Sequence, residues 1–330
     1  PASFAPSVID GFGWLMNLCR DISSMRAFRI GRRVVLTIGA FDGVHLGHKA
    51  LLTRVVELAT SENMMPVAMS FEPTPKEFFS KGEAPARLAR FRERYELMRQ
   101  EGMAAFFCAR FNKRMAEISV DGFVQSLLVE GLGISRLVIG DDFRFGHRAA
   151  GSVADLRAAG DRFGFSVEQI PSVEVLGVRA SSTRIREALA EGELELATRL
   201  LGRSFRLSGK VIRGQQLGRT LGYPTANIAL HRRTSPVQGI FAVRIDGIDE
   251  HTYDGVASIG TRPTVAGVGV LLEVFVFDFS GDLYGKRLDV ALVKKLRDEL
   301  KFDSLDALTV QMDKDAADAR AALAAVTLSG

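Results

Sequence analysis

Residues 33–52 read "RVVLTIGAFDGVHLGHKALL" and join a short β-branched run to a helical pattern through a glycine-rich turn. A strand that ends at glycine and leads into a helix is typical of a parallel sheet covered by helices. His45 and His48 lie three residues apart at this turn. The turn alone leaves four interpretations open: metal ligands, an acid/base pair, a phosphate clamp, or polar residues that fill the turn.

The same alternation of strand-like and helix-like runs continues through residue 202. Strand-like runs cover residues 65–73, 103–111, 135–143 and 165–177, and helical patterns cover 86–102, 120–133, 151–164 and 181–202. This order predicts an α/β domain with a doubly wound parallel sheet and helices on both faces.

The residue pattern changes after residue 203, where closely spaced glycines separate short β-rich runs. Such spacing predicts an antiparallel sheet or barrel, and a helical pattern over the last thirty or so residues closes the chain. A chain of 330 residues is long for a single core. We therefore predict two domains, residues 1–203 and residues 204–330.

The composition is that of a globular protein, with 47% hydrophobic and 25% charged residues and a net charge of +4. The charge suits anionic small molecules, but no basic stripe predicts a nucleic-acid partner. "RFRERY" (90–95) mixes charge signs and indicates a solvated helix face. No apolar run approaches the ~20 residues of a membrane span, and Cys19 and Cys108 lie far apart, which fits a reducing cytoplasm. A homo-oligomer stays open.

Three short stretches favour the phosphate interpretation of the turn. Gly39 and Gly43 permit a tight turn, and the helix that follows offers free N–H groups to an anion. "RASSTRIREAL" (179–189) places three hydroxyl residues and two arginines at a helix start, which suits a triphosphate. "GDDFRFG" (140–146) follows a strand and offers two aromatic rings for a flat ligand. Each stretch alone also fits a structural role as a turn, a cap or core.

The paired stretches "GAFDGVHLGH" and "RASSTRIR" resemble the signature of nucleotidylyltransferases that activate ATP at its α-phosphate. With "GDDFRFG" between them, they resemble the adenylyltransferase half of prokaryotic bifunctional riboflavin kinase/FAD synthetases. The resemblance implies that His45 and His48 contact the ATP phosphates, and it implies one ATP-binding set: Gly39, Phe41, Asp42, Gly43, His45, His48, Arg179, Ser181, Ser182, Thr183 and Arg186. It also implies a flavin side formed by Asp142, Phe143 and Phe145. One position departs from the family: Thr74 in "FEPTP" stands where the family usually has histidine.

The second half of the chain carries a separate motif, "GRTLGYPTANI" (218–228). Pro224 favours an extended chain, so Thr225 and Asn227 project to one face and offer hard oxygen ligands suited to Mg²⁺. A turn in which these side chains bond their own backbone is the structural alternative. Glu273 lies within the apolar run "VLLEVFVFDF" (270–279), where it is either at a sheet edge or a general base with a raised pKa.

These stretches resemble the riboflavin kinase domain of the same family. The resemblance implies a six-stranded antiparallel barrel in which Gly218, Thr225 and Asn227 bind Mg²⁺ and the ATP phosphates. Glu273 is then the base that deprotonates the 5′-hydroxyl of riboflavin. Val265 stands where the family often has phenylalanine.

The sequence therefore predicts a bifunctional enzyme that makes FMN from riboflavin and FAD from FMN. Its ligands are riboflavin, FMN, FAD and ATP with Mg²⁺, and we expect no tightly bound organic cofactor and no membrane partner. Two alternatives stay open: a riboflavin kinase whose first domain is inactive or altered, as Thr74 allows, and a flavin-sensing regulator without turnover, against which the intact Glu273 argues.

Overall fold

The computed structural model of the chain describes residues 16–80, 84–213, 223–232, 234–264 and 267–327. Its internal contacts divide the chain into two compact units, Pro1–Ser182 and Thr183–Gly330. We call them the N-terminal unit and the C-terminal unit and describe each by itself.

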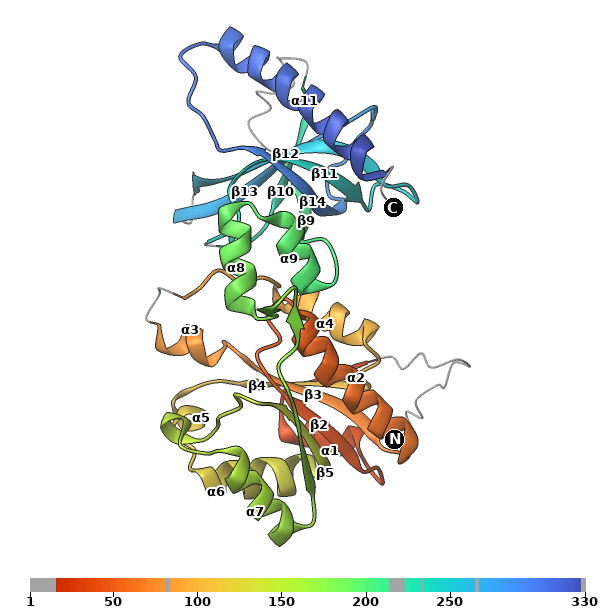
Figure 1. Cartoon of the computed structure of the whole chain (residues 1–330), viewed down its shortest axis with the longest axis vertical. Helices are drawn as coiled ribbons and strands as arrows, with labels where there is room; N and C mark the ends of the chain where they lie inside the picture. The colour runs from red at the N-terminus through yellow and green to blue at the C-terminus, as the bar shows by residue number, and fades with distance from the viewer. Residues whose placement is uncertain (1–15, 81–83, 214–222, 233, 265–266, 328–330) are drawn as a thin grey trace. The chain divides into compact units, whose positions relative to one another are not determined.

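A six-stranded sheet of parallel strands forms the centre of the N-terminal unit (Figure 1). The strands lie in the order β1-β4-β3-β2-β5-β6. Their bounds are β1 (Asn17–Cys19), β2 (Val34–Ile38), β3 (Met65–Glu72), β4 (Ala105–Arg110), β5 (Ile134–Gly140) and β6 (Ser166–Ile170). From β2 the chain proceeds outward through β3 to β4 and then returns to β5 on the other side of β2. The predicted doubly wound parallel sheet is confirmed, and its switch point lies between β2 and β5.

Helices cover both faces of this sheet, with α2 and α4 on one side and α7 on the other (Figure 1). Within β2, Val34, Leu36 and Ile38 belong to the core formed with α1, η1 and α7, whereas Val35 belongs to the core formed with α2 and α4. This alternation explains the continuous apolar run of the strand. The helical elements and a short hairpin are α1 (Ile22–Phe28), α2 (Leu46–Ser61), α3 (Pro75–Phe79), α4 (Phe91–Gln100), α5 (Lys113–Ala116), α6 (Val120–Gly122), the π-helix η1 (Phe123–Leu132), η2 (His147–Ala149), α7 (Val153–Phe163), β7 (Glu174–Val175) and β8 (Val178–Arg179).

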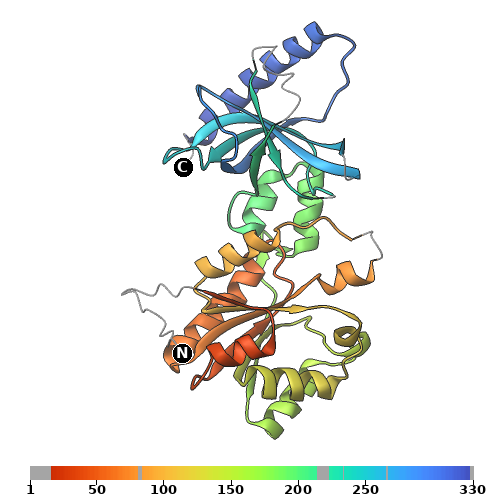
Figure 2. The ribbon, with the colours of Figure 1, turned by 180° about the vertical axis from the view of Figure 1, so that it is seen from behind.

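The C-terminal unit contains a closed barrel of six antiparallel strands, seen from the opposite side in Figure 2. The strands close in the order β10-β13-β12-β11-β14-β9. Their bounds are β9 (Arg206–Ile212), β10 (Thr225–Ala229), β11 (Gly239–Asp246), β12 (Tyr253–Thr264), β13 (Gly267–Val276) and β14 (Arg287–Arg297), and the helices of this part are α8 (Ser182–Glu191), α9 (Leu194–Leu201) and α11 (Leu305–Thr327). The predicted barrel and closing helix are confirmed.

Helix α11 packs on the outside of the barrel through a small apolar cluster and ion pairs that include Arg297–Asp315 and Arg320–Asp278. Ala319 and Leu323 contact the buried Phe277, just beyond the end of β13. Arg297, the last residue of β14, donates two hydrogen bonds of 2.8 and 2.6 Å to the buried carboxylate of Asp315. A bidentate, largely buried pair fixes both distance and orientation, so the helix is held at a defined place on the barrel.

Candidate active sites

The loop that joins β2 to α2 lies at the switch point of the N-terminal sheet, where ligands of open α/β sheets bind. We call residues 39–45 the phosphate loop. Phe41, Gly43 and Val44 have φ values of +49°, +81° and +42°, and the side chains of Phe41 and Val44 are fully buried. A β-branched residue in the left-handed region is a genuine outlier and persists only where its surroundings fix it. The loop is therefore strained at Phe41 and Val44, and its buried surroundings hold it in this shape.

His45 and His48 form a stacked pair at the start of α2. Their ring centroids are 3.7 Å apart with an interplanar angle of 22°. His45 caps the helix, and its Nδ1 accepts the backbone N–H of His48 at 3.3 Å. A neutral His45 ring consequently carries its proton on Nε2, assigned from this hydrogen bond. Burial, and next the proximity of His45, hold the pKa of His48 well below its usual value. The His48 ring is therefore neutral near neutral pH.

The segment that starts α8 lies against the phosphate loop, although about 140 residues separate the two in sequence. The Ser182 hydroxyl donates to the carbonyl of Asp42 at 2.9 Å. A Cβ placed on Gly47 would lie 3.1 Å from the carbonyl oxygen of Ala180. The structure thus brings together two of the predicted ATP-binding stretches. Thr183 and Arg186 follow on α8 in the C-terminal unit, and their roles stay predictions.

Two predicted ligands already have structural partners within the N-terminal unit. The Asp42 carboxylate accepts the backbone N–H groups of residues 88 and 89 at 3.1 and 2.9 Å. Arg179 pairs with Asp141 at 3.2 Å and with Asp142 at 2.8 Å. Asp142 is therefore joined to the predicted ATP side, whereas Phe143 and Phe145 line an aromatic cavity.

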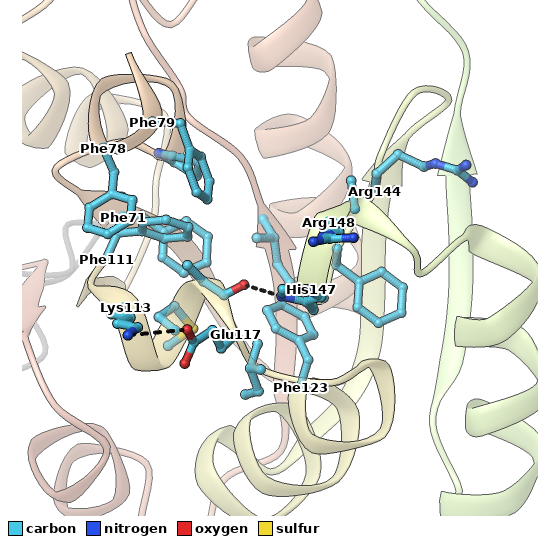
Figure 3. Close-up of a pocket in the computed structure, with 18 of the residues that line it drawn as sticks. Phe71, Phe78, Phe79, Phe111, Lys113, Glu117, Phe123, Arg144, His147 and Arg148 are labelled. Atoms are coloured by element: carbon cyan, nitrogen blue, oxygen red, sulfur yellow. Dashed lines mark hydrogen bonds and ion pairs between the residues drawn. The ribbon is translucent and has the colours of Figure 1, made fainter. Parts of the chain in front are cut away.

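This cavity, which we call the aromatic pocket, has a volume of about 560 Å³ and opens at the carboxyl ends of β2 to β5. Four phenylalanines missed by the sequence analysis gather on one side of it in Figure 3: Phe71, Phe78, Phe79 and Phe111. Most of their rings meet edge to face, for example Phe78 and Phe111 at 5.3 Å between centroids. Phe71 and Phe111 lie at the ends of the two predicted strands, residues 65–73 and 103–111, and Phe78 and Phe79 follow the first of them. That position was the available signal.

Two arginines, Arg144 and Arg148, bring positive charge to the opposite side of the aromatic pocket in Figure 3, and His147 lies beside them. Lys113 also lines the pocket, but it pairs with Glu117 at 3.9 Å. Arg148 and Ala149 have φ values of +52° and +56°, unusual for residues other than glycine. Two backbone hydrogen bonds between residues 145 and 151, of 3.3 and 2.8 Å, close the loop that carries these groups. An apolar cavity with a cationic rim suits a flat aromatic ligand that carries an anion.

Arg94 shows that the prediction of a solvated face for residues 90–95 was wrong. Its side chain is 1% exposed on α4. Nη1 donates to the carbonyl of Ala40 in the phosphate loop at 2.9 Å, and Nη2 donates to Glu72 at 2.6 Å. The charge is buried because a carboxylate at the end of β3 compensates it, and both partners come from distant parts of the sequence.

In the C-terminal unit, the strand register places the predicted kinase residues in one row. Asn227 on β10 faces Glu273 on β13, and Glu273 faces Ser258 on β12. Thr225 pairs with Phe275, one step along the same face. Ala226 and Ile228, the alternate residues of β10, point to the other face and are 8% and 0% exposed. Thr225 and Asn227 therefore share a face, as predicted.

Glu273 does not lie at a sheet edge, because β13 pairs on both sides within a closed barrel. The structural alternative raised by the sequence is thus removed. Gly218 and Val265, singled out above, lie outside the described residues.

A family model described as FAD synthetase matches residues 28–184, and one described as riboflavin kinase matches residues 201–323. The bifunctional riboflavin kinase/FMN adenylyltransferase of Escherichia coli (strain K12) is 46% identical over 286 residues, which cover 87% of this chain and 91% of that protein. The chain belongs to this family of bifunctional enzymes. The riboflavin kinase/FMN adenylyltransferase of Pseudomonas fluorescens is 47% identical and covers 93% of this chain and 97% of its own length. That of Haemophilus influenzae is 43% identical with coverages of 93% and 99%.

A solved structure from Streptococcus pneumoniae, described as a macrolide-efflux protein, shares the fold of this chain. The TM-score is 0.79 at 29% identity, with 91% of this chain and 97% of that one covered. Within the described part of the chain, no helix has both the length and the apolar character needed to cross a membrane.

The two activities predicted from the sequence are those of the family: riboflavin is phosphorylated to FMN, and FMN is adenylylated to FAD, with ATP as co-substrate. Thr74 caps helix α3; its hydroxyl accepts the backbone N–H of Glu77 at 3.3 Å and donates to the Glu77 carboxylate at 3.0 Å. Thr74, which departs from the family pattern, thus serves as the N-cap of this helix.

Proposed function

We propose that the aromatic pocket holds the isoalloxazine ring of FMN while the phosphate loop and α2 hold the phosphates of ATP. The observation that carries this proposal is that both features meet at one edge of the sheet: Ile38 ends β2, lines the pocket and leads directly into the phosphate loop. A cavity of about 560 Å³ lies within the range of small-molecule sites. The cationic rim suits the FMN phosphate.

The transfer itself needs no protein nucleophile. An oxygen of the FMN phosphate attacks the α-phosphorus of ATP, the bond from that phosphorus to the bridging oxygen breaks, and pyrophosphate leaves. The protein then contributes alignment and stabilisation of charge. We assign to His45 and His48 hydrogen bonds to the phosphoryl oxygens, supported by the N-terminus of α2.

The remaining predicted ATP ligands extend the phosphate site. We propose that Arg179 and Ser181 face the polyphosphate from the segment next to the phosphate loop. Thr183 and Arg186, the other two predicted ligands, follow Ser182 in sequence and are proposed for the set on that ground alone. Arg179 would exchange its contacts with Asp141 and Asp142 for phosphate oxygens.

Phe79 offers the most direct test, because it lines the aromatic pocket and is 63% exposed, so its removal leaves the core intact. Stacking of an aromatic ring on a flat ligand contributes roughly 1–3 kcal/mol. Phe79→Ala should therefore raise the KM for FMN in FAD synthesis by roughly 5- to 150-fold and leave riboflavin kinase activity unchanged. Ile30→Ala is the matched control, since Ile30 is 78% exposed before β2, at the other end of that strand. An unchanged KM for FMN in Phe79→Ala would refute the placement of the flavin.

For the kinase activity we propose Glu273 as the general base. It would take the proton of the riboflavin 5′-hydroxyl, whose oxygen attacks the γ-phosphorus of ATP as ADP leaves. The row formed by Asn227, Glu273 and Ser258 supports this role, because it gathers polar groups on one face of an otherwise apolar strand.

Mg²⁺ fits the same face. The hydroxyl of Thr225 and the carboxamide oxygen of Asn227 are hard, neutral ligands of the kind that Mg²⁺ combines with nucleotide phosphates. Asn227 is 7% exposed beside a carboxylate, so its orientation is restricted. When bound, the ion would neutralise phosphate charge; Thr225 and Asn227 would hold it, with Gly218 near the phosphates.

We propose the functional boundary at residues 203 and 204. The two family matches leave residues 185–200 between them, whereas contacts group α8 and α9 with the barrel. Assigning both helices to the adenylyltransferase keeps Thr183 and Arg186 in one domain with the phosphate loop. Limited proteolysis should then release a fragment that ends near residue 203.

A further inference from the structure

Four charged side chains form a continuous ladder from the phosphate loop to the wall of the aromatic pocket. Arg94 pairs with Glu72 at 2.6 Å, and the other oxygen of Glu72 pairs with Arg87 at 2.5 Å. Arg87 then binds both oxygens of Glu77, one through Nε and the other through Nη2 at 2.6 Å. The charges alternate in sign, so the ladder is neutral as a whole.

At one end the ladder fixes the phosphate loop. The same Nη1 of Arg94 that donates to Ala40 also donates to Ser70 at 3.2 Å. The Nε of Arg94 is buried without a hydrogen-bond partner, so the position of the guanidinium depends on the bonds that Nη1 and Nη2 make to Ala40, Ser70 and Glu72. The carbonyl of Ala40 directly precedes Phe41, where the left-handed run of the loop begins. Arg94 thus constrains the loop where its backbone is strained.

At the other end the ladder fixes helix α3. The Glu77 carboxylate accepts the backbone N–H of Thr74 at 2.8 Å and so completes the capping box of this helix. Burial alone would raise the pKa of Glu77, but hydrogen bonds from Arg87 and Thr74 lower it to about 2. Phe78 and Phe79 follow directly and line the aromatic pocket. The orientation of Glu77 therefore sets the direction of this wall.

We propose that Arg94, Glu72, Arg87 and Glu77 are positioning residues that couple the two substrates of FAD synthesis. Binding of ATP phosphates at the phosphate loop stabilises one arrangement of the ladder, and that arrangement places Phe78 and Phe79 for the flavin. The inference rests on the proposed placement of FMN. It adds that neither substrate binds independently of the other and names the side chains responsible.

Arg87 is the residue to change, because it joins the two halves of the ladder and leaves both ends in place. Initial rates of FAD synthesis by the full chain, with FMN and ATP both varied, give the KM for FMN at low and at saturating ATP. Coupling energies of 1–3 kcal/mol correspond to about 5- to 150-fold. We expect saturating ATP to lower the KM for FMN at least fivefold in the unchanged protein and less than twofold in Arg87→Met. Equal effects of ATP in both proteins, or no effect in the unchanged one, would overturn the coupling.

Arg94 provides the second measurement. Arg94→Met should lower kcat of FAD synthesis about tenfold, the effect of a shift of roughly 0.5 Å in the phosphate loop. Arg94→Lys should recover most of the loss, since an ammonium group still donates to the carbonyl of Ala40. Arg99→Met is the control: Arg99 lies on the same helix, pairs with Glu96 at 2.9 Å and is about half exposed. Riboflavin kinase activity reports correct folding, so loss of both activities in Arg94→Met, or a kcat equal to that of Arg99→Met, counts against the proposal.

The two proposals fail in different ways. If Phe79→Ala leaves the KM for FMN unchanged, the flavin does not lie in the aromatic pocket. If Phe79→Ala weakens FMN but Arg87→Met keeps the full effect of ATP, the flavin placement stands and the ladder has no coupling role.

Discussion

Gly47→Ala is expected to separate activity from stability in the adenylyltransferase. Gly47 is the second residue of α2, and its φ is not in the left-handed region. An added Cβ would lie 3.1 Å from the carbonyl oxygen of Ala180 and 3.2 Å from two atoms of the His45 ring. These contacts are tighter than usual, so the ring and the 180–182 segment must move apart by a few tenths of an ångström.

The size of the effect follows from that displacement. A 1 Å misplacement of catalytic groups costs about 100-fold in rate, so a shift of roughly half that size should cost about tenfold, or about 1.4 kcal/mol in the activation free energy. Stability should respond differently, because alanine is favoured over glycine within a helix by about 1 kcal/mol. We expect the free energy of unfolding of Gly47→Ala to stay within about 1 kcal/mol of the unchanged protein.

The assay uses one protein preparation for three measurements. Conversion of FMN to FAD with ATP, separated by chromatography, should fall about tenfold, the size derived above. Conversion of riboflavin to FMN should be unchanged, and urea unfolding gives the stability. FAD synthesis within twofold of the unchanged protein would show that the contact between the two ATP-binding segments does not matter. Loss of both activities would mean that the substitution acts through folding.

Four further outcomes are expected. Glu273→Gln should abolish FMN formation while conversion of FMN to FAD persists, and loss of both would indicate misfolding rather than a missing base. The double variant His45→Ala, His48→Ala should lose FAD synthesis and keep kinase activity. Retained FAD synthesis would show that the two histidines are not needed to bind the ATP phosphates. Thr225→Ala should raise the Mg²⁺ concentration needed by the kinase step alone, and an unchanged Mg²⁺ titration would remove it as a ligand. The pKa of Glu77 is lowered from 4.5 to about 2, so its stabilising contribution is complete above pH 4.5 and is lost as the pH falls toward 2. Glu77→Gln should therefore lower the free energy of unfolding by about 1–2 kcal/mol at pH 7, after allowance for solvent screening, and by less at pH 3. An equal difference at both pH values would contradict the pKa.

The order of apolar runs, helical patterns and glycines along the sequence was sufficient to predict the sheet of the N-terminal unit and the barrel of the C-terminal unit. The run of residues 33–41 has the apolar continuity of a strand buried on both faces, and glycine ends it where β2 ends. The antiparallel barrel followed from glycine-separated β runs in the same way. Strand β1 was not predicted, because three residues carry no periodic signal and the strand is defined by its pairing with β4.

Site residues could be predicted to lie together only where they are within a few positions of one another in the sequence. His45 and His48 share one turn, and Thr225 and Asn227 share one strand, so their proximity follows from local geometry. The burial of Arg94 depends on Ala40 and Glu72, which precede it by 54 and 22 residues. Charged neighbours in sequence made a solvated face the reasonable prediction, and only tertiary contacts reverse it.

The aromatic pocket is a similar case. Phe71 lies near the end of β3, whereas Phe78, Phe111 and Phe143 follow β3, β4 and β5. Their convergence depends on the strand order, which alternation alone does not specify. A sequence search can find residues after strands, but which of them face one cavity depends on the fold.

The low pKa of His48 has a consequence for product release if ATP binds at the proposed phosphate site. An anionic phosphate beside an imidazole favours the protonated ring, so ATP held there would draw a proton onto His48. Departure of pyrophosphate would remove this influence, and the ring would return to its neutral form. A permanent cation such as lysine would keep attracting pyrophosphate after the reaction. A histidine in this position would therefore bind the polyphosphate during transfer and favour the departure of the leaving group afterwards.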